Sequence, residues 1–164
     1  MICAKISKAL NEQMNREFFN SRLYLSMATY FHSINLEGAA HWMELQAQEE
    51  TGHAMRLYKQ LLERGARVTV EAIPAPSQEW GSPLAAFQDA YKHECTVSKQ
   101  FDALVALARA EKDNATEIFL QWFVTEQVEE EASTDAVVQR LRLAEKAKGG
   151  ALFMIDRMLG ERGK

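Results

Sequence analysis

Five side chains of metal-binding type recur on the apolar faces of stretches with helical periodicity. Glu50 and His53 stand three residues apart, a spacing that places both on one face of a helix. Glu17, Glu94 and Glu130 lie in the apolar stripes of three further helical stretches. A carboxylate rarely occupies a core position unless it is paired or bound to a cation. Four stretches that each turn a carboxylate toward one core therefore predict a metal site.

The types of these ligands favour particular metals. Hard oxygen ligands with one imidazole suit Fe(II), Fe(III) or Mn(II), whereas zinc sites more often carry thiolates or several histidines. Two divalent ions would cancel the four negative charges. We expect Glu50 and Glu130 to face both ions, with Glu17 and His53 completing one side and Glu94 the other. Without metal, burial and like charges should raise the pKa of some carboxyls, so that protons replace the ions.

Two neighbours of the ligands are candidates for supporting roles. Tyr24 lies one heptad after Glu17 and is first a core residue, although it could also donate a hydrogen bond to a ligand or supply an electron. Gln127, one turn before Glu130, is a candidate hydrogen-bond partner of a ligand or a weak ligand itself.

A second acidic group adjoins the first in the sequence. Glu49, Glu126 and Glu129 flank Glu50 and Glu130. A solvated helix face is the simpler interpretation of such residues. Convergence with Glu130 would instead let them hold a third cation, on an exit route from the two-metal site.

The elements that must position these residues are helices. The three prolines, Pro74, Pro76 and Pro83, cluster in one segment and leave long stretches free of helix breakers. The stripes predict a first helix from about residue 5 to the turn near Asn35, a second over about 37–64, a third that begins at Ser82–Pro83, and a fourth over about 114–147. We therefore predict an all-α fold.

The connections indicate how these helices are arranged. Short turns near Asn35 and Lys112 make antiparallel hairpins of helices one and two and of helices three and four. The roughly 18 residues from Gly65 to Ser82 are long enough to run the length of a bundle, so helices two and three should be parallel. We predict a single domain over 1–164: a four-helix bundle at about 5–147, then a short helix at about 150–161 after a break at Gly149–Gly150.

This topology predicts the height of each ligand along the bundle. In an antiparallel hairpin, residues equidistant from the turn lie side by side. Glu17 and His53 are equidistant from position 35, and Glu94 and Glu130 from position 112. Glu50 and Glu94 also lie at similar distances from the starts of two parallel helices. All five side chains are therefore expected in one layer near the middle of the bundle.

Composition limits the classes of partner. The 164 residues carry a net charge of -4, without the basic excess that would indicate a nucleic-acid partner. We expect no membrane partner, because no segment approaches ~18 consecutive apolar residues. The start, MICAKISKAL, lacks the apolar run of a signal peptide, and the two cysteines are isolated. A cytoplasmic protein is expected.

These residues together resemble the ferritins, specifically the non-haem prokaryotic type. The resemblance covers nearly the whole chain and rests on the segments LNEQMNREFFNSRLYLSMATYF, HWMELQAQEETGHAM, SPLAAFQDAYKHE and FLQWFVTEQVEEEAS. It implies Fe(II) oxidation by O2 or hydrogen peroxide at a di-iron centre within each subunit, and storage of ferric mineral in a shell of twenty-four subunits. The implied ferroxidase positions are Glu17, Glu50, His53, Glu94, Gln127 and Glu130, and those of a third iron site are Glu49, Glu126, Glu129 and Glu130.

Departures from related families sharpen the resemblance. The fourth helix carries Gln127-Val128-Glu129-Glu130, without the second ExxH of a symmetric di-iron bundle. Thr51 stands where a bacterioferritin would place its haem-binding methionine, so no haem is expected. Two other functions stay open: a di-iron oxidoreductase or peroxidase without storage, and a helical interaction module whose acids are structural.

Overall fold

The computed structural model describes residues 2–147 and 150–163, and every regular element within them is a helix. The predicted all-α fold is confirmed, with bounds close to those expected. The five helices are α1 (Ala4–Ser33), α2 (Glu37–Glu63), α3 (Pro83–Ala110), α4 (Asn114–Lys146) and α5 (Ala151–Leu159). The single-domain assignment over residues 1–164 stays a prediction.

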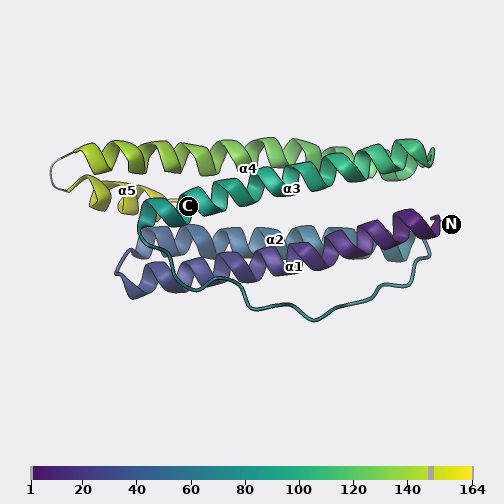
Figure 1. Cartoon of the computed structure of the whole chain (residues 1–164), viewed down its shortest axis with the longest axis horizontal. Helices are drawn as coiled ribbons and strands as arrows, with labels where there is room; N and C mark the ends of the chain where they lie inside the picture. Colours follow the sequence, from purple (N-terminus) through teal and green to yellow (C-terminus); the bar gives the residue numbers. More distant parts are fainter. Residues whose placement is uncertain (1, 148–149, 164) are drawn as a thin grey trace.

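The first four helices form two hairpins that pack on one another. Figure 1 shows α1 beside α2 in one layer and α3 beside α4 in the other. Each hairpin turns at a residue with positive φ, Asn35 at 58° and Lys112 at 56°. Asparagine tolerates this left-handed backbone better than most residues do, whereas at Lys112 it is strained. Both predicted hairpins are confirmed.

The long crossover follows α1 from one end of the bundle to the other (Figure 1). The Asn11 side chain both donates to and accepts from the backbone of Thr69, at 3.1 and 2.8 Å. Further along, Ser26 Oγ donates to the carbonyl of Ser77 at 2.6 Å. The crossover therefore runs in the direction of α1, which returns the chain to the end where α2 began. This arrangement makes α2 and α3 parallel, as predicted.

Side-chain caps fix the starts of the second hairpin. Ser82 Oγ accepts from the backbone N–H of Ala85, and Pro83 follows as the first helical residue of α3. Asp113 Oδ1 accepts from the backbone N–H of Thr116 at the start of α4. The same carboxylate receives two hydrogen bonds from Arg64, at 3.1 and 2.9 Å. Asp113 thus caps α4 and also ties the second hairpin to the end of α2.

The apolar core is divided into two clusters by a buried polar layer. One cluster lies toward the α1–α2 turn and includes Phe31, Met43 and Phe87; the other lies toward the α3–α4 turn and includes Leu10, Leu57 and Phe101. Between them, on α1 to α4, lie the buried polar residues Gln13, Glu17, Asn20, Gln46, Glu50, His53, Glu94, Gln127, Glu130 and Thr134. A polar layer in mid-core requires either internal partners or bound ions.

The predicted fifth helix is confirmed and docks on the start of α2. Gly150, with φ of 72°, precedes it; the predicted breaker Gly149 lies outside the described residues. Asp156 Oδ1 accepts from the backbone N–H of Ala39 at 2.8 Å and so caps α2 from a distance. The approach is close enough that a Cβ on Gly38 would lie 1.7 Å from the Asp156 carbonyl oxygen. Only glycine fits at position 38 without moving α5.

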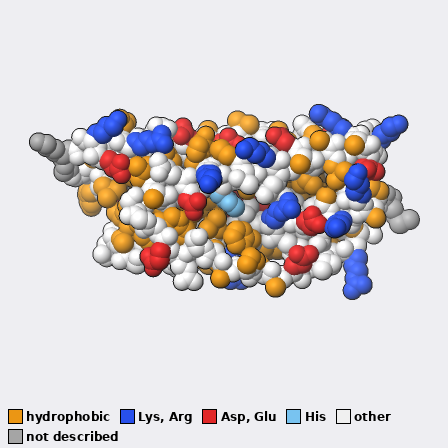
Figure 2. Space-filling view, viewed as in Figure 1, with side chains coloured by type: hydrophobic (Ala, Val, Ile, Leu, Met, Phe, Trp, Pro, Cys, Tyr) orange, Lys and Arg blue, Asp and Glu red, His pale blue; other side chains and the backbone are white. Residues whose placement is uncertain are grey.

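The surface mixes both charge signs with apolar side chains. Figure 2 shows acidic and basic side chains interspersed along the length of the bundle on the visible face.

Among the described residues, none of the helices is both long and apolar enough to cross a membrane.

Candidate metal centre

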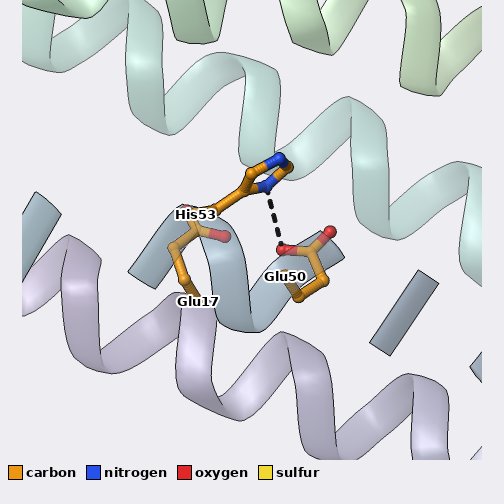
Figure 3. A group of neighbouring side chains, drawn as sticks. All are labelled: Glu17, Glu50 and His53. Carbon is orange, nitrogen blue, oxygen red and sulfur yellow. Dashed lines mark ion pairs between the residues drawn. The ribbon is translucent and has the colours of Figure 1, made fainter. Parts of the chain in front are cut away.

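Three predicted ligands from two helices meet in the polar layer. Glu17 projects from α1, and Glu50 and His53 project from α2 toward it (Figure 3). One ligand atom from each lies within 4.8 Å of the other two. All three side chains are buried, with exposed fractions of 0%, 1% and 4%. The structure therefore brings this part of the predicted set together in a group that one ion could occupy.

Two atoms of this group lack hydrogen-bond partners. Glu50 Oε1 and His53 Nδ1 are buried and have no hydrogen-bond partner among the described residues. Glu50 Oε2 lies 3.5 Å from His53 Nδ1, the ion pair drawn in Figure 3. A buried polar atom without a partner costs about 1–3 kcal/mol. A cation between the two side chains would satisfy both atoms, so the donor set fits a hard or borderline metal ion.

Glu94 enters the same layer from α3 and accepts hydrogen bonds from two of the predicted supporting residues. The Tyr24 hydroxyl donates to Glu94 Oε1, and Gln127 Nε2 donates to Glu94 Oε2 at 3.0 Å. Both partners are buried. Tyr24 and Gln127 therefore donate hydrogen bonds to a predicted ligand, which is one of the roles expected of each.

Glu130 enters from α4 and belongs to a second group of ligand type. One ligand atom each of His53, Glu126 and Glu130 lies within 4.8 Å of the others. Glu130 Oε2 accepts a hydrogen bond from Gln46 Nε2 at 2.7 Å. His53 is common to both groups, so the groups from α1–α2 and from α4 share one layer.

Burial and mutual repulsion perturb the carboxyls of this layer. Burial, and then the charge of Glu50, raise the pKa of Glu17 well above its ordinary value. Burial is likewise the largest cause of the raised pKa of Glu50, with the charge of Glu94 next. The pKa of Glu94 is also raised by burial, although hydrogen bonds from Tyr24 and Gln127 oppose the rise.

The pKa of Glu130 is raised into the neutral range. Burial, and then the charge of Glu94, raise the pKa of Glu130 to about 7. At neutral pH the metal-free layer therefore retains protons in place of part of its negative charge. Cations that bind there would displace those protons, so metal binding and proton release are coupled.

The sequence interpretation missed several polar residues that support the acids. Gln13 Nε2 donates to Glu17 Oε1 at 2.7 Å. Asn20 Nδ2 donates to Glu17 Oε2 at 2.8 Å and to Glu50 Oε2 at 3.4 Å. His93 Nε2 donates to Asn20 Oδ1 at 2.9 Å and so holds the orientation of the Asn20 amide. The sequence feature that pointed to Gln13 and Asn20 was their spacing, because each lies one helical turn from Glu17.

The residues predicted for a third cation are only partly brought together. Glu126 lies with His53 and Glu130, as described above. Glu49 and Glu129 are exposed, and neither belongs to such a ligand group within residues 2–147 and 150–163. Glu49 Oε2 instead pairs with Arg162 Nη2 at 2.6 Å. The sequence interpretation did not foresee this ion pair.

Comparison with known proteins agrees with this arrangement. The family model described as the ferritin-like domain matches residues 7–144. The chain is 45% identical over 162 residues to a bacterial non-heme ferritin of Bacteroides fragilis (strain 638R), across 99% of this chain and 100% of that protein. A bacterial non-heme ferritin of Staphylococcus aureus (strain MRSA252) is 37% identical over 163 residues, across 99% and 97%.

A solved structure extends the similarity to the backbone. The open pore ferritin from the hyperthermophilic archaeon Archaeoglobus fulgidus superposes with a TM-score of 0.96 and 49% sequence identity. The match covers 99% of each chain, α5 included. The family match, the identities and the shared backbone agree with one another. This chain therefore belongs to the ferritin family, in its non-haem prokaryotic branch.

Proposed function

We propose that this protein stores and detoxifies iron by oxidising Fe(II) at a two-iron centre in each subunit and holding the ferric product as mineral inside a hollow shell. Membership of the ferritin family supports iron storage and a ferroxidase activity in general terms. The oxidation mechanism, the number of ions and the residues that bind them are parts of the proposal.

The observation that carries the proposal is the buried group of Glu17, Glu50 and His53 with two unpaired atoms. A structural role for these acids would require partners for every buried polar atom. Glu50 Oε1 and His53 Nδ1 have no hydrogen-bond partner among the described residues, and both side chains belong to the ligand group that one ion could occupy. The surrounding acids supply the negative charge that two Fe(II) ions require.

In the proposed centre, Glu50 and Glu130 face both Fe(II) ions. Glu17 and His53 complete one side and Glu94 the other. Amides on α1, α2 and α4 hold the carboxylates in place, so the ions meet ligands that are already oriented. Protons held by the acids leave as Fe(II) binds. No haem takes part.

Oxidation in this centre uses the two Fe(II) ions together as the electron source. Two ions supply two electrons, which together with two protons reduce O2 to hydrogen peroxide or hydrogen peroxide to two water molecules. Tyr24 donates a hydrogen bond to Glu94 and would orient that ligand. Ferric iron then leaves by a third site at Glu49, Glu126, Glu129 and Glu130 toward the mineral.

Storage requires assembly. We propose a homo-24-mer in the cytoplasm, with Fe(II) and O2 or hydrogen peroxide as its partners and neither nucleic acid nor membrane involved. Apolar side chains on α5, Phe153 and Met154 among them, are 73% and 72% exposed in the single chain and are available for contacts between subunits.

Single-site variants test the proposed centre. Glu50→Ala and Glu130→Ala should each slow the first phase of Fe(II) oxidation by more than about a hundredfold, because loss of a partner that merely orients a ligand already costs about 10–100-fold. Glu145→Ala is the matched control, an exposed glutamate on α4 outside the polar layer. Stopped-flow absorbance after mixing with Fe(II) and O2 measures the rate.

Two outcomes would remove the proposal. Rapid oxidation in both ligand variants at the wild-type rate would show that the chemistry lies elsewhere. A protein that oxidises Fe(II) but stays a small oligomer without mineral, by light scattering after iron loading, would instead be the di-iron oxidoreductase without storage.

A further inference from the structure

Arg162 lies beyond α5 and returns to the acidic side of the polar layer. Its Nη2 donates to Glu49 Oε2 at 2.6 Å, and its Nη1 donates to Gln46 Oε1 at 2.9 Å. The guanidinium carbon lies 4.3 Å from the centre of the Trp42 ring. The side chain is only 24% exposed. These contacts hold the guanidinium in one place.

One amide connects this cation to the candidate metal centre. Gln46 accepts from Arg162 through its oxygen and donates through its nitrogen to Glu130 Oε2 at 2.7 Å. Glu130 and Glu126 belong to the ligand group that includes His53. The guanidinium therefore lies at the edge of the acids proposed for a third cation, with Glu49 already neutralised.

The segment that carries Arg162 is anchored by contacts other than the Glu49 ion pair. His41 Nε2 donates to the Arg162 carbonyl at 3.0 Å, and Asp156 caps α2 through Ala39. Leu159 is buried, with an exposed fraction of 4%. Because these contacts are independent of Glu49, the guanidinium can leave that carboxylate while the tail stays docked.

We propose that Arg162 is a tethered counter-ion for Glu49, which a third cation must displace before it can bind that carboxylate. The proposal rests on the proposed function, since the third cation site is part of it. A guanidinium is weakly hydrated and spreads its charge, whereas a divalent cation concentrates twice the charge. The metal can therefore replace the arginine, but it binds more weakly than at an unoccupied carboxylate. This competition would keep the affinity of the third site low and favour onward transfer of its ion.

Zn(II) is a suitable probe because it binds oxygen and nitrogen ligands without redox chemistry. Equilibrium binding to the metal-free assembled protein gives the affinity of each class of site. Arg162→Gln keeps hydrogen-bonding groups near Gln46 and Glu49 but removes the charge. It should tighten the weakest site by about 1.5-fold to fivefold, the scale of a partly exposed ion pair. The two tightest sites should keep their wild-type affinities.

Three further variants separate charge from structure. Arg162→Lys keeps a positive charge and should hold the weakest site near its wild-type affinity. Arg157→Gln is the matched control, an exposed arginine on α5 with no ion pair among the described residues, and should change nothing. In a Glu49→Gln background, Arg162→Gln should no longer tighten binding, because the two residues would act through the same contact.

Trp42 offers a readout in the unaltered protein. Displacement of the guanidinium from its ring should change the indole emission as the weakest site fills, and Trp42→Phe should abolish that change. The proposal would be overturned if Arg162→Gln bound Zn(II) at the weakest site no more tightly than the wild type does. If Arg162→Gln does not fold, the wild-type protein decides: Trp42 emission that stays unchanged while the weakest site fills would overturn the proposal. Absence of the two tight sites from the wild-type protein would contradict the proposed function itself.

Discussion

Glu130 makes the stability of the metal-free protein depend on pH. Burial raises its pKa from 4.5 to about 7. A carboxyl with a raised pKa in the folded state favours folding while it is protonated and opposes folding once ionised. Its contribution is therefore fully present below about pH 4.5 and is lost as the pH rises through 7. The neutral variant Glu130→Gln removes this dependence and retains an acceptor for Gln46.

The size of the effect follows from the shift. A pKa that rises from 4.5 to about 7 corresponds to about 3 kcal/mol between the two protonation states. With an exposed fraction of 5%, Glu130 is little screened by solvent. At pH 8 the Glu130→Gln protein should therefore be more stable than the wild type by about 3 kcal/mol. Near pH 4 the two should differ by less than about 0.5 kcal/mol.

Urea unfolding of chelator-treated protein from pH 4 to 8 measures this difference. Both proteins must be compared at one protein concentration and in the same assembly state, because oligomers gain apparent stability by mass action. Exposed Glu145→Gln on the same helix is the control and should follow the wild-type profile. Parallel profiles for the wild type and Glu130→Gln would refute the assignment of a buried, mutually repelling carboxyl at position 130.

Three further variants test the supporting structure. Asn20→Ala removes hydrogen bonds to two predicted ligands and should slow the first phase of Fe(II) oxidation by about 10–100-fold in stopped flow; a wild-type rate would contradict its orienting role. Gly38→Ala would place a Cβ 1.7 Å from the Asp156 carbonyl oxygen, so α5 must move and its amides should exchange faster with deuterium; unchanged protection would show that the contact is not close. Asp113→Ala removes the cap of α4 and the partner of Arg64, and should cost about 1–2 kcal/mol in urea unfolding; an unchanged midpoint would rule out the cap.

The height of the acids could be predicted from the sequence because helices have a fixed rise per residue. Once short turns near Asn35 and Lys112 define two hairpins, distance from the turn determines which residues lie side by side. Glu17 and His53 are close in space for that reason. The crossover direction followed from its length alone, and its hydrogen bonds along α1 show the same path.

The partners of the acids were harder to predict. An amide one turn from a glutamate can reach several acceptors through different side-chain rotamers, so spacing does not select Gln13 or Asn20. The position of Arg162 depends on how α5 folds back after Gly150, and helical periodicity does not carry direction across such a break. Its ion pair with Glu49 joins residues 113 positions apart and needed the three-dimensional structure.

The central claim is tested most directly by a crystal structure of the protein soaked anaerobically in Fe(II), with anomalous scattering recorded at the iron edge. We predict two iron peaks in the polar layer, one bound by Glu17, Glu50 and His53 and the other by Glu94, with Glu50 and Glu130 contacting both. Iron peaks confined to the protein surface, with Glu50 Oε1 and His53 Nδ1 still unpaired, would contradict the account.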